Sequence, residues 1–142
     1  MAGIRVQSAV KKIEVNDNGE YISLNLSDSS FPERFFAMID NIQKRAGDLQ
    51  AQAAEIAEKC GSESEAAVKA AASLYREFNQ DITNEVDAMF GPETCRKVFG
   101  DIVPSFEMFD DFFNQLVPYI QEYGRERAAK LSKYSAARTG NV

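Results

Sequence analysis

The sequence of residues 31–61 is FPERFFAMIDNIQKRAGDLQAQAAEIAEKCG. Apolar or small side chains recur along it in steps of four and three, at Phe35, Ile39, Ile42, Ala46, Leu49, Ala53, Ile56 and Cys60. A stripe that repeats about every 3.5 residues predicts one long helix with a single buried face. Pro32 suits the first turn of this helix, and Gly61 predicts its end.

A second helix is predicted from about Ser62 to Met89. Ser62 and Glu65 have the spacing of a capping box, and the apolar stripe that follows is Ala67, Ala71, Leu74, Tyr75, Phe78, Ile82, Val86 and Met89. The short break between this helix and the preceding one predicts an antiparallel helical hairpin.

Two further helices are predicted in the C-terminal part. A short one covers about residues 92–99, between two glycines that suit helix C-caps. The last begins near Ser105 and carries a stripe of Phe106, Phe109, Phe113, Leu116, Ile120 and Tyr123. Pro118 is expected to kink or split this helix, since proline removes a backbone donor.

Residues 12–26 predict a β-hairpin, because apolar and polar side chains alternate on both sides of Asn16-Asp17-Asn18-Gly19. Ile4 and Val6 suggest a third short strand. A hairpin alone is marginal in water, so we expect it to pack on the helices. The predicted fold is mainly α, an N-terminal β-hairpin on a helical bundle, with one domain over residues 1–134 and a disordered tail over 135–142.

Charge is distributed unevenly along the chain. Residues 1–123 contain 11 Lys and Arg against 21 Asp and Glu, a net charge of −10. Residues 124–142 carry a net charge of +4, from Arg125, Arg127, Lys130, Lys133 and Arg138 against Glu126. A basic end on an acidic body indicates a protein that binds macromolecules. We expect an acidic protein partner or a solubilising role for this end, and no nucleic-acid binding, since the basic patch is small and has no aromatic platform.

The composition excludes several kinds of chemistry. The chain has no histidine, which removes Ser-His-Asp and Cys-His catalysis and His-ligated metal sites. Cys60 and Cys95 lie in no metal-binding or redox motif and are expected to be free, buried thiols. No secretory signal and no apolar run long enough to span a membrane is evident. We therefore expect a cytoplasmic protein that is not an enzyme and has no cofactor or metal.

Glu77, Asp81 and Glu85 follow one another at intervals of four residues on the second predicted helix. Such an acidic ridge could bind a divalent cation, but the Glu-x-x-His element of helical di-metal sites is missing. A solvated face, or a docking face for a basic partner, is the favoured interpretation.

Four phenylalanines give the last predicted helix its strongest apolar signal: Phe106, Phe109, Phe112 and Phe113. Burial in the core is the first interpretation of this cluster. A partly exposed stripe would instead be an interaction site, and on that hypothesis Phe106, Phe109 and Phe112 contribute to a partner-binding groove, together with the basic residues Arg125, Arg127, Lys130 and Lys133.

The layout resembles the tail-assembly chaperones of long-tailed, non-contractile bacteriophages and prophages. The likeness rests on the hairpin that leads through Phe31-Pro32 into a helix, the helical middle ending in Met89-Phe90-Gly91, the segment ending in Val98-Phe99-Gly100, and the Phe-rich helix over 106–123 with its basic end. It covers most of the chain but includes no catalytic motif.

The resemblance implies a small cytoplasmic protein of the bacterial host that is absent from the mature virion. Such chaperones bind the tape-measure protein, keep its apolar helices soluble, and help recruit tail-tube subunits. Two alternatives stay open: a structural tail or head–tail component of the virion, and a bacterial helical-hairpin interaction protein. Homo-oligomerisation through the apolar stripes also stays open.

Overall fold

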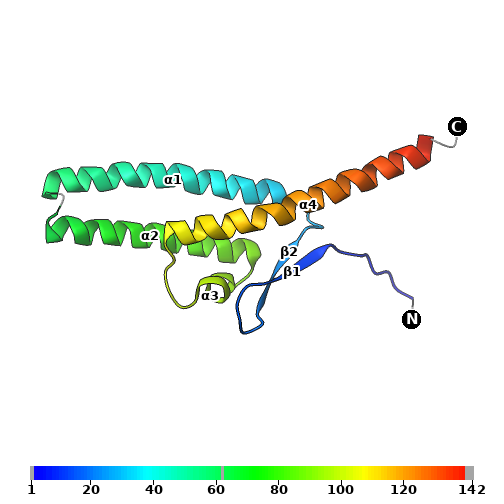
Figure 1. The fold of residues 1–142 in the computed structure, drawn as a ribbon, viewed down its shortest axis with the longest axis horizontal. Helices are drawn as coiled ribbons and strands as arrows, with labels where there is room; N and C mark the ends of the chain where they lie inside the picture. Colours follow the sequence, from blue (N-terminus) through cyan, green and yellow to red (C-terminus); the bar gives the residue numbers. More distant parts are fainter. Residues whose placement is uncertain (1, 62, 140–142) are drawn as a thin grey trace. The chain divides into compact units, whose positions relative to one another are not determined.

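The computed structural model describes residues 2–61 and 63–139, with side chains as far as Ser135. Over these residues the chain forms a two-stranded antiparallel sheet followed by four helices (Figure 1). The predicted class, mainly α with an N-terminal β-hairpin, is confirmed. The chain divides into two compact units, one ending at Met108 and one beginning at Phe109.

The hairpin consists of β1 (Val10–Glu14) and β2 (Tyr21–Asn25), with Ile13 opposite Ile22. Its turn is held by Asn16, whose Oδ1 accepts hydrogen bonds from the backbone N–H groups of Asn18 and Glu20. Gly19 has φ +78°, a conformation that favours glycine. The third strand expected at Ile4 and Val6 is absent, and both side chains are exposed. The strand pairing runs from Val10 opposite Asn25 to Glu14 opposite Tyr21, and the Leu26 N–H donates to the Ala9 carbonyl just beyond it.

Ile22 and Leu24 on β2 are buried, and β2 packs against the second and third helices. This contact supplies the apolar partner that an isolated hairpin lacks. The hairpin thus belongs to the helical core of the first unit, as predicted.

The helical hairpin is formed by α1 (Phe31–Cys60) and α2 (Glu65–Phe90), which run side by side in opposite directions (Figure 1). Phe35, Ile42 and Leu49 of the predicted α1 stripe are buried, whereas Cys60 at its end is exposed. The prediction that Cys60 is a buried thiol was therefore wrong, because the stripe loses its cover near the end of the helix.

The α1–α2 turn differs in detail from the predicted capping box. Ser64, rather than Ser62, is the N-cap of α2, and its hydroxyl accepts a hydrogen bond from the N–H of Ala67 at 3.1 Å. Ser62 lies outside the described residues. A serine at either position offers the same acceptor, so the pattern alone did not distinguish them.

The third helix, α3 (Thr94–Phe99), lies between Gly91 and Gly100, both with positive φ, as their predicted C-cap role requires. Cys95 is buried, and its backbone N–H donates to Asp87 Oδ1 at 2.9 Å. This bond ties α3 to α2.

The last helix, α4, spans Phe106–Thr139 without interruption at Pro118, so the predicted split does not occur. A mid-helix proline removes a single donor, and the helix continues on both sides. Residues 135–139 are helical, unlike the disordered tail predicted from Ser135; residues 140–142 lie outside the described residues. Ala136, Ala137 and Arg138 within this stretch are good helix formers, a preference that the prediction of disorder did not take into account.

Candidate interaction surfaces

A groove of about 260 Å³ opens between α1 and α2. Its floor is apolar and consists of Leu49 on α1 with Leu74 and Phe78 on α2. Its rim carries Asp48 on α1 with Glu77 and Asp81 on α2. An apolar floor with a charged rim is the arrangement that helix-in-groove recognition uses.

Arg45 explains how the acidic ridge of α2 is accommodated. Its Nη1 lies 3.0 Å from Glu85 Oε1 and its Nη2 lies 3.4 Å from Asp81 Oδ2. The guanidinium also lies 5.5 Å from the centre of the Phe78 ring, within cation–π range. One cation from α1 therefore bridges two carboxylates that would repel each other on α2.

The metal hypothesis for this ridge gains no support. Two of its three carboxylates bind Arg45, and the described residues contain no cluster of three or more His, Cys, Asp or Glu side chains able to hold a metal ion. Two carboxylates of the ridge, Glu77 and Asp81, line the groove, and Arg45 from α1 partly neutralises Asp81 and Glu85.

Two rim carboxylates keep their charge uncompensated. No ion pair joins Asp48 or Glu77 to any side chain that the structure describes, and both residues are exposed. The groove therefore presents an excess of negative charge to solvent, even with Arg45 in its lining.

The phenylalanines that the sequence suggested for a binding groove are mostly inaccessible. Phe109 is fully buried, Phe112 is 8% exposed, and only Phe106 is half-buried. Burial, the first of the two interpretations of this cluster, describes Phe109 and Phe112. Phe106 stacks on Phe78 of the groove floor, with ring centres 6.3 Å apart, and does not itself line the groove.

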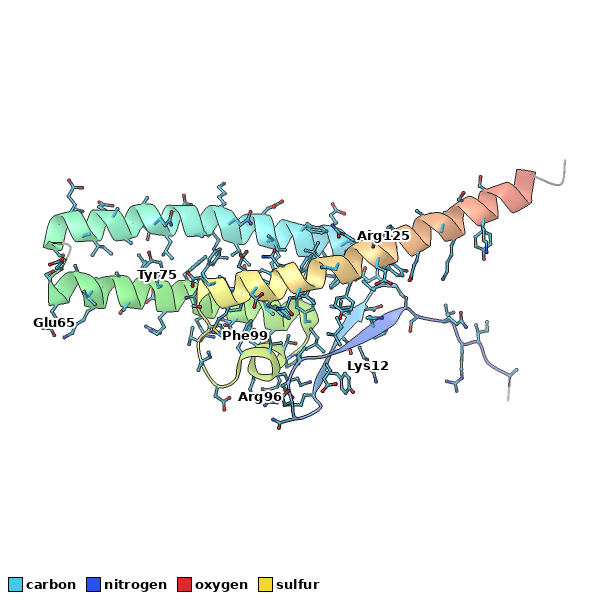
Figure 2. The ribbon with its side chains drawn as sticks, in the orientation of Figure 1. Lys12, Glu65, Tyr75, Arg96, Phe99 and Arg125 are labelled. Atoms are coloured by element: carbon cyan, nitrogen blue, oxygen red, sulfur yellow. The ribbon has the colours of Figure 1, made fainter. Side chains whose placement is uncertain are left out.

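The basic residues predicted as partner-binding are all exposed on the C-terminal half of α4: Arg125, Arg127, Lys130 and Lys133. Figure 2 labels Arg125 at the start of this segment. No described side chain forms an ion pair with any of the four. Leu131 and Tyr134 beside them are 57% and 71% exposed. We call residues 124–135 the basic end of α4.

A polar contact joins the hairpin to α3. Asn16 Nδ2 donates to the Lys97 carbonyl at 3.0 Å, and Arg96, labelled in Figure 2, lies 3.2 Å from Glu20 Oε2 and also pairs with Glu93. The hydrogen bond from Asn16, then the contacts with Arg96 and the charge of Lys97, lower the pKa of Glu20. This contact fixes the hairpin and is separate from the groove.

Cys95 has the properties of a structural thiol. Burial, followed by the nearby Asp87 carboxylate, raises its pKa to about 12. The side chain is therefore a neutral thiol at physiological pH and a poor nucleophile.

Sequence reasoning found the floor residues as parts of two apolar stripes, and Glu77 and Asp81 as an acidic ridge. It did not single out Arg45 or Asp48. A signal was available, because Arg45 and Asp81 stand equally far from the α1–α2 turn and so lie level in an antiparallel hairpin.

Comparison with protein-family models assigns the chain to a family. Residues 18–141 match a family of unknown function, DUF6673. The chain belongs to this family. The match begins in the turn of the β-hairpin and includes both the groove and the basic end of α4. No curated protein and no solved structure matches the chain significantly. No helix among the described residues is long and apolar enough to cross a membrane.

Proposed function

We propose that this protein is a bacteriophage tail-assembly chaperone that binds and solubilises the tape-measure protein and helps recruit tail-tube subunits. The observation that carries the proposal is the groove between α1 and α2, with Leu49, Leu74 and Phe78 as its floor and carboxylates at its rim. The layout of the chain, which resembles such chaperones, supplies the identity of the client.

The groove suits a client with an amphipathic helix. Leu74 is half-buried, so part of the floor is open to a ligand's apolar side chains. Asp48 and Glu77 have no ion pair within the described chain and can bind Lys or Arg on the flanks of a client helix. Covering the apolar face of a long helix in this way reduces the exposed surface that drives aggregation.

The proposed binding site, the α1–α2 groove, differs from the Phe-rich site that the sequence suggested. Phe109 and Phe112 are buried, and Phe106 contributes through its stacking on Phe78. The client would therefore contact α1 and α2. It would bind in the host cytoplasm and be released before the virion matures.

The test begins with the DNA that flanks the gene. The proposal predicts a tail-tube gene upstream and a very long helical reading frame downstream. Co-expression of that downstream protein with the full chain is expected to bring it into the soluble fraction, where the two proteins co-purify.

Two variants locate the activity. Leu74→Glu places a charge on the floor of the groove and should abolish solubilisation. Val68→Glu, on the same helix at a side chain that is 59% exposed and outside the groove, should leave it unchanged. Equal behaviour of the two variants would refute the groove as the site. Recovery of the protein from purified particles would instead favour a structural virion component.

A further inference from the structure

A second surface of the chain is complementary to the groove. We propose that the basic end of α4 in one copy docks into the α1–α2 groove of a second copy, so that the protein self-associates. This inference goes beyond the proposed function and does not depend on the identity of the client, because both surfaces belong to this chain.

The basic end of α4 has one face that combines apolar and cationic side chains. Successive helical residues turn by about 100°, which places Arg127, Lys130, Leu131 and Tyr134 within an arc of about 100°. Leu131 and Tyr134 are 57% and 71% exposed. Around the helix the order is Lys130, Tyr134, Arg127 and Leu131, so cations and exposed apolar side chains alternate on this face.

The groove offers the matching arrangement. Its floor provides Leu49, Leu74 and Phe78 for apolar side chains, and its rim provides unpaired carboxylates at Asp48 and Glu77. Exposed cations without partners and exposed carboxylates without partners attract each other, which steers the two surfaces together and sets their orientation.

The two surfaces also agree in length. The groove extends along α2 from Leu74 to Asp81, and the docking face of α4 extends from Arg127 to Tyr134. Each interval corresponds to two helical turns, about 10 Å at a rise of 1.5 Å per residue. The docking face of α4 can therefore lie along the whole length of the groove, with its apolar and cationic side chains within reach of the floor and the rim.

The exposure of this helical segment gives a further reason to expect a partner. Residues 124–135 are helical, and every one of them is exposed. An isolated helix of this length is marginal in water, and most helical stability in proteins comes from packing of an apolar face. Docking into a groove supplies that packing.

The contact is heterologous, since a groove on one copy receives a helix from another. Such contacts close into a pair when two copies exchange their helices, and otherwise form open chains. Either arrangement gives a mass that rises with protein concentration above the 15.8 kDa of one chain. Sedimentation velocity of the full chain measures this directly.

The decisive experiment exchanges the charges. A rim variant, Asp48→Lys with Glu77→Lys, and an α4 variant, Arg127→Glu with Lys130→Glu, should each weaken self-association about tenfold or more. A mixture of the two variants should restore it, because the basic groove of one meets the acidic helix of the other. The control variant, Arg5→Glu with Lys12→Glu, reverses two exposed cations elsewhere and should associate like the wild type.

Several results would overturn the proposal. The proposal is refuted if the wild-type chain stays monomeric at all concentrations. A basic end that docks into the groove of its own chain would give this result. It is also refuted if the charge reversals do not weaken association. The same holds if both variants give the wild-type circular dichroism spectrum but their mixture fails to restore association. If a reversed variant does not fold, Asp48→Asn and Lys130→Gln replace it, and each must weaken association. A wild-type chain that solubilises the client but does not self-associate would refute this inference alone.

Discussion

Arg45 is the residue whose removal most directly tests the architecture of the α1–α2 hairpin. Its guanidinium binds Asp81 and Glu85 on the opposite helix and lies over the Phe78 ring. Arg45→Met keeps an unbranched apolar stem of similar shape and removes the charge and its donors. Asp81 and Glu85 then remain as like charges four residues apart on one helix.

The expected loss follows from the exposure of these groups. The Arg45 side chain is 32% exposed, while Asp81 and Glu85 are 62% and 41% exposed, so solvent weakens both ion pairs. Each pair at this exposure contributes about 0.2–1 kcal/mol, and the cation–π contact about 0.5–1 kcal/mol. With the added repulsion on α2, Arg45→Met should lower the free energy of unfolding by about 1–3 kcal/mol.

Urea unfolding followed by circular dichroism measures this loss. The midpoint should fall with an unchanged m-value, and the deficit should shrink at about 1 M salt, where the screening length is about 3 Å. Arg76→Met is the matched control, because Arg76 is exposed on α2 and has no ion pair with a described side chain. The reasoning is refuted if the two variants are equally stable, or if the deficit of Arg45→Met is independent of salt.

Three further predictions concern the first compact unit. Ile82 is fully buried on α2, and Ile82→Ala should cost about 2–5 kcal/mol in urea unfolding; a loss below that of a surface substitution would contradict the core assignment. Exposed Cys60 should react with Ellman's reagent at pH 8 while buried Cys95, with its pKa raised to about 12, reacts only in denaturant; two fast thiols in the native protein would be inconsistent with this. The pKa of Glu20 is lowered from 4.5, so its contribution to stability is present above that pH and is lost as the pH falls below it. Glu20→Gln should therefore make the free energy of unfolding less dependent on pH in the acid range. An unchanged pH dependence would mean that the contacts of Glu20 with Asn16 and Arg96 do not contribute to it.

The sequence predicted those parts of the fold that depend on local periodicity. The stripe through Phe35, Ile42 and Leu49 indicated the buried face of α1, and the asparagine and glycine of the hairpin turn indicated the reversal between β1 and β2. These features are readable because burial repeats with the period of the helix and turns need particular residues.

The candidate site was harder to predict, since it depends on which residues face each other across two helices. Leu74 and Phe78 were recognised only as core residues, and the open part of the floor became evident once α1 and α2 were placed together. For the Phe-rich cluster, burial was the first interpretation and holds for Phe109 and Phe112, whereas the alternative of an exposed groove does not. Phe109 and Phe112 have the composition of an interaction site, yet both are buried, and composition does not distinguish a core face from an exposed one.

Site-specific photo-crosslinking tests the central claim, that the α1–α2 groove is a binding site. A photoreactive phenylalanine analogue is placed at Leu74 in the groove or at Val68 outside it, and the full chain is produced together with the genes that flank its own. The account predicts adducts with the long helical client from position 74 and none from position 68. Adducts from position 68 alone, or equally from both positions, would contradict it.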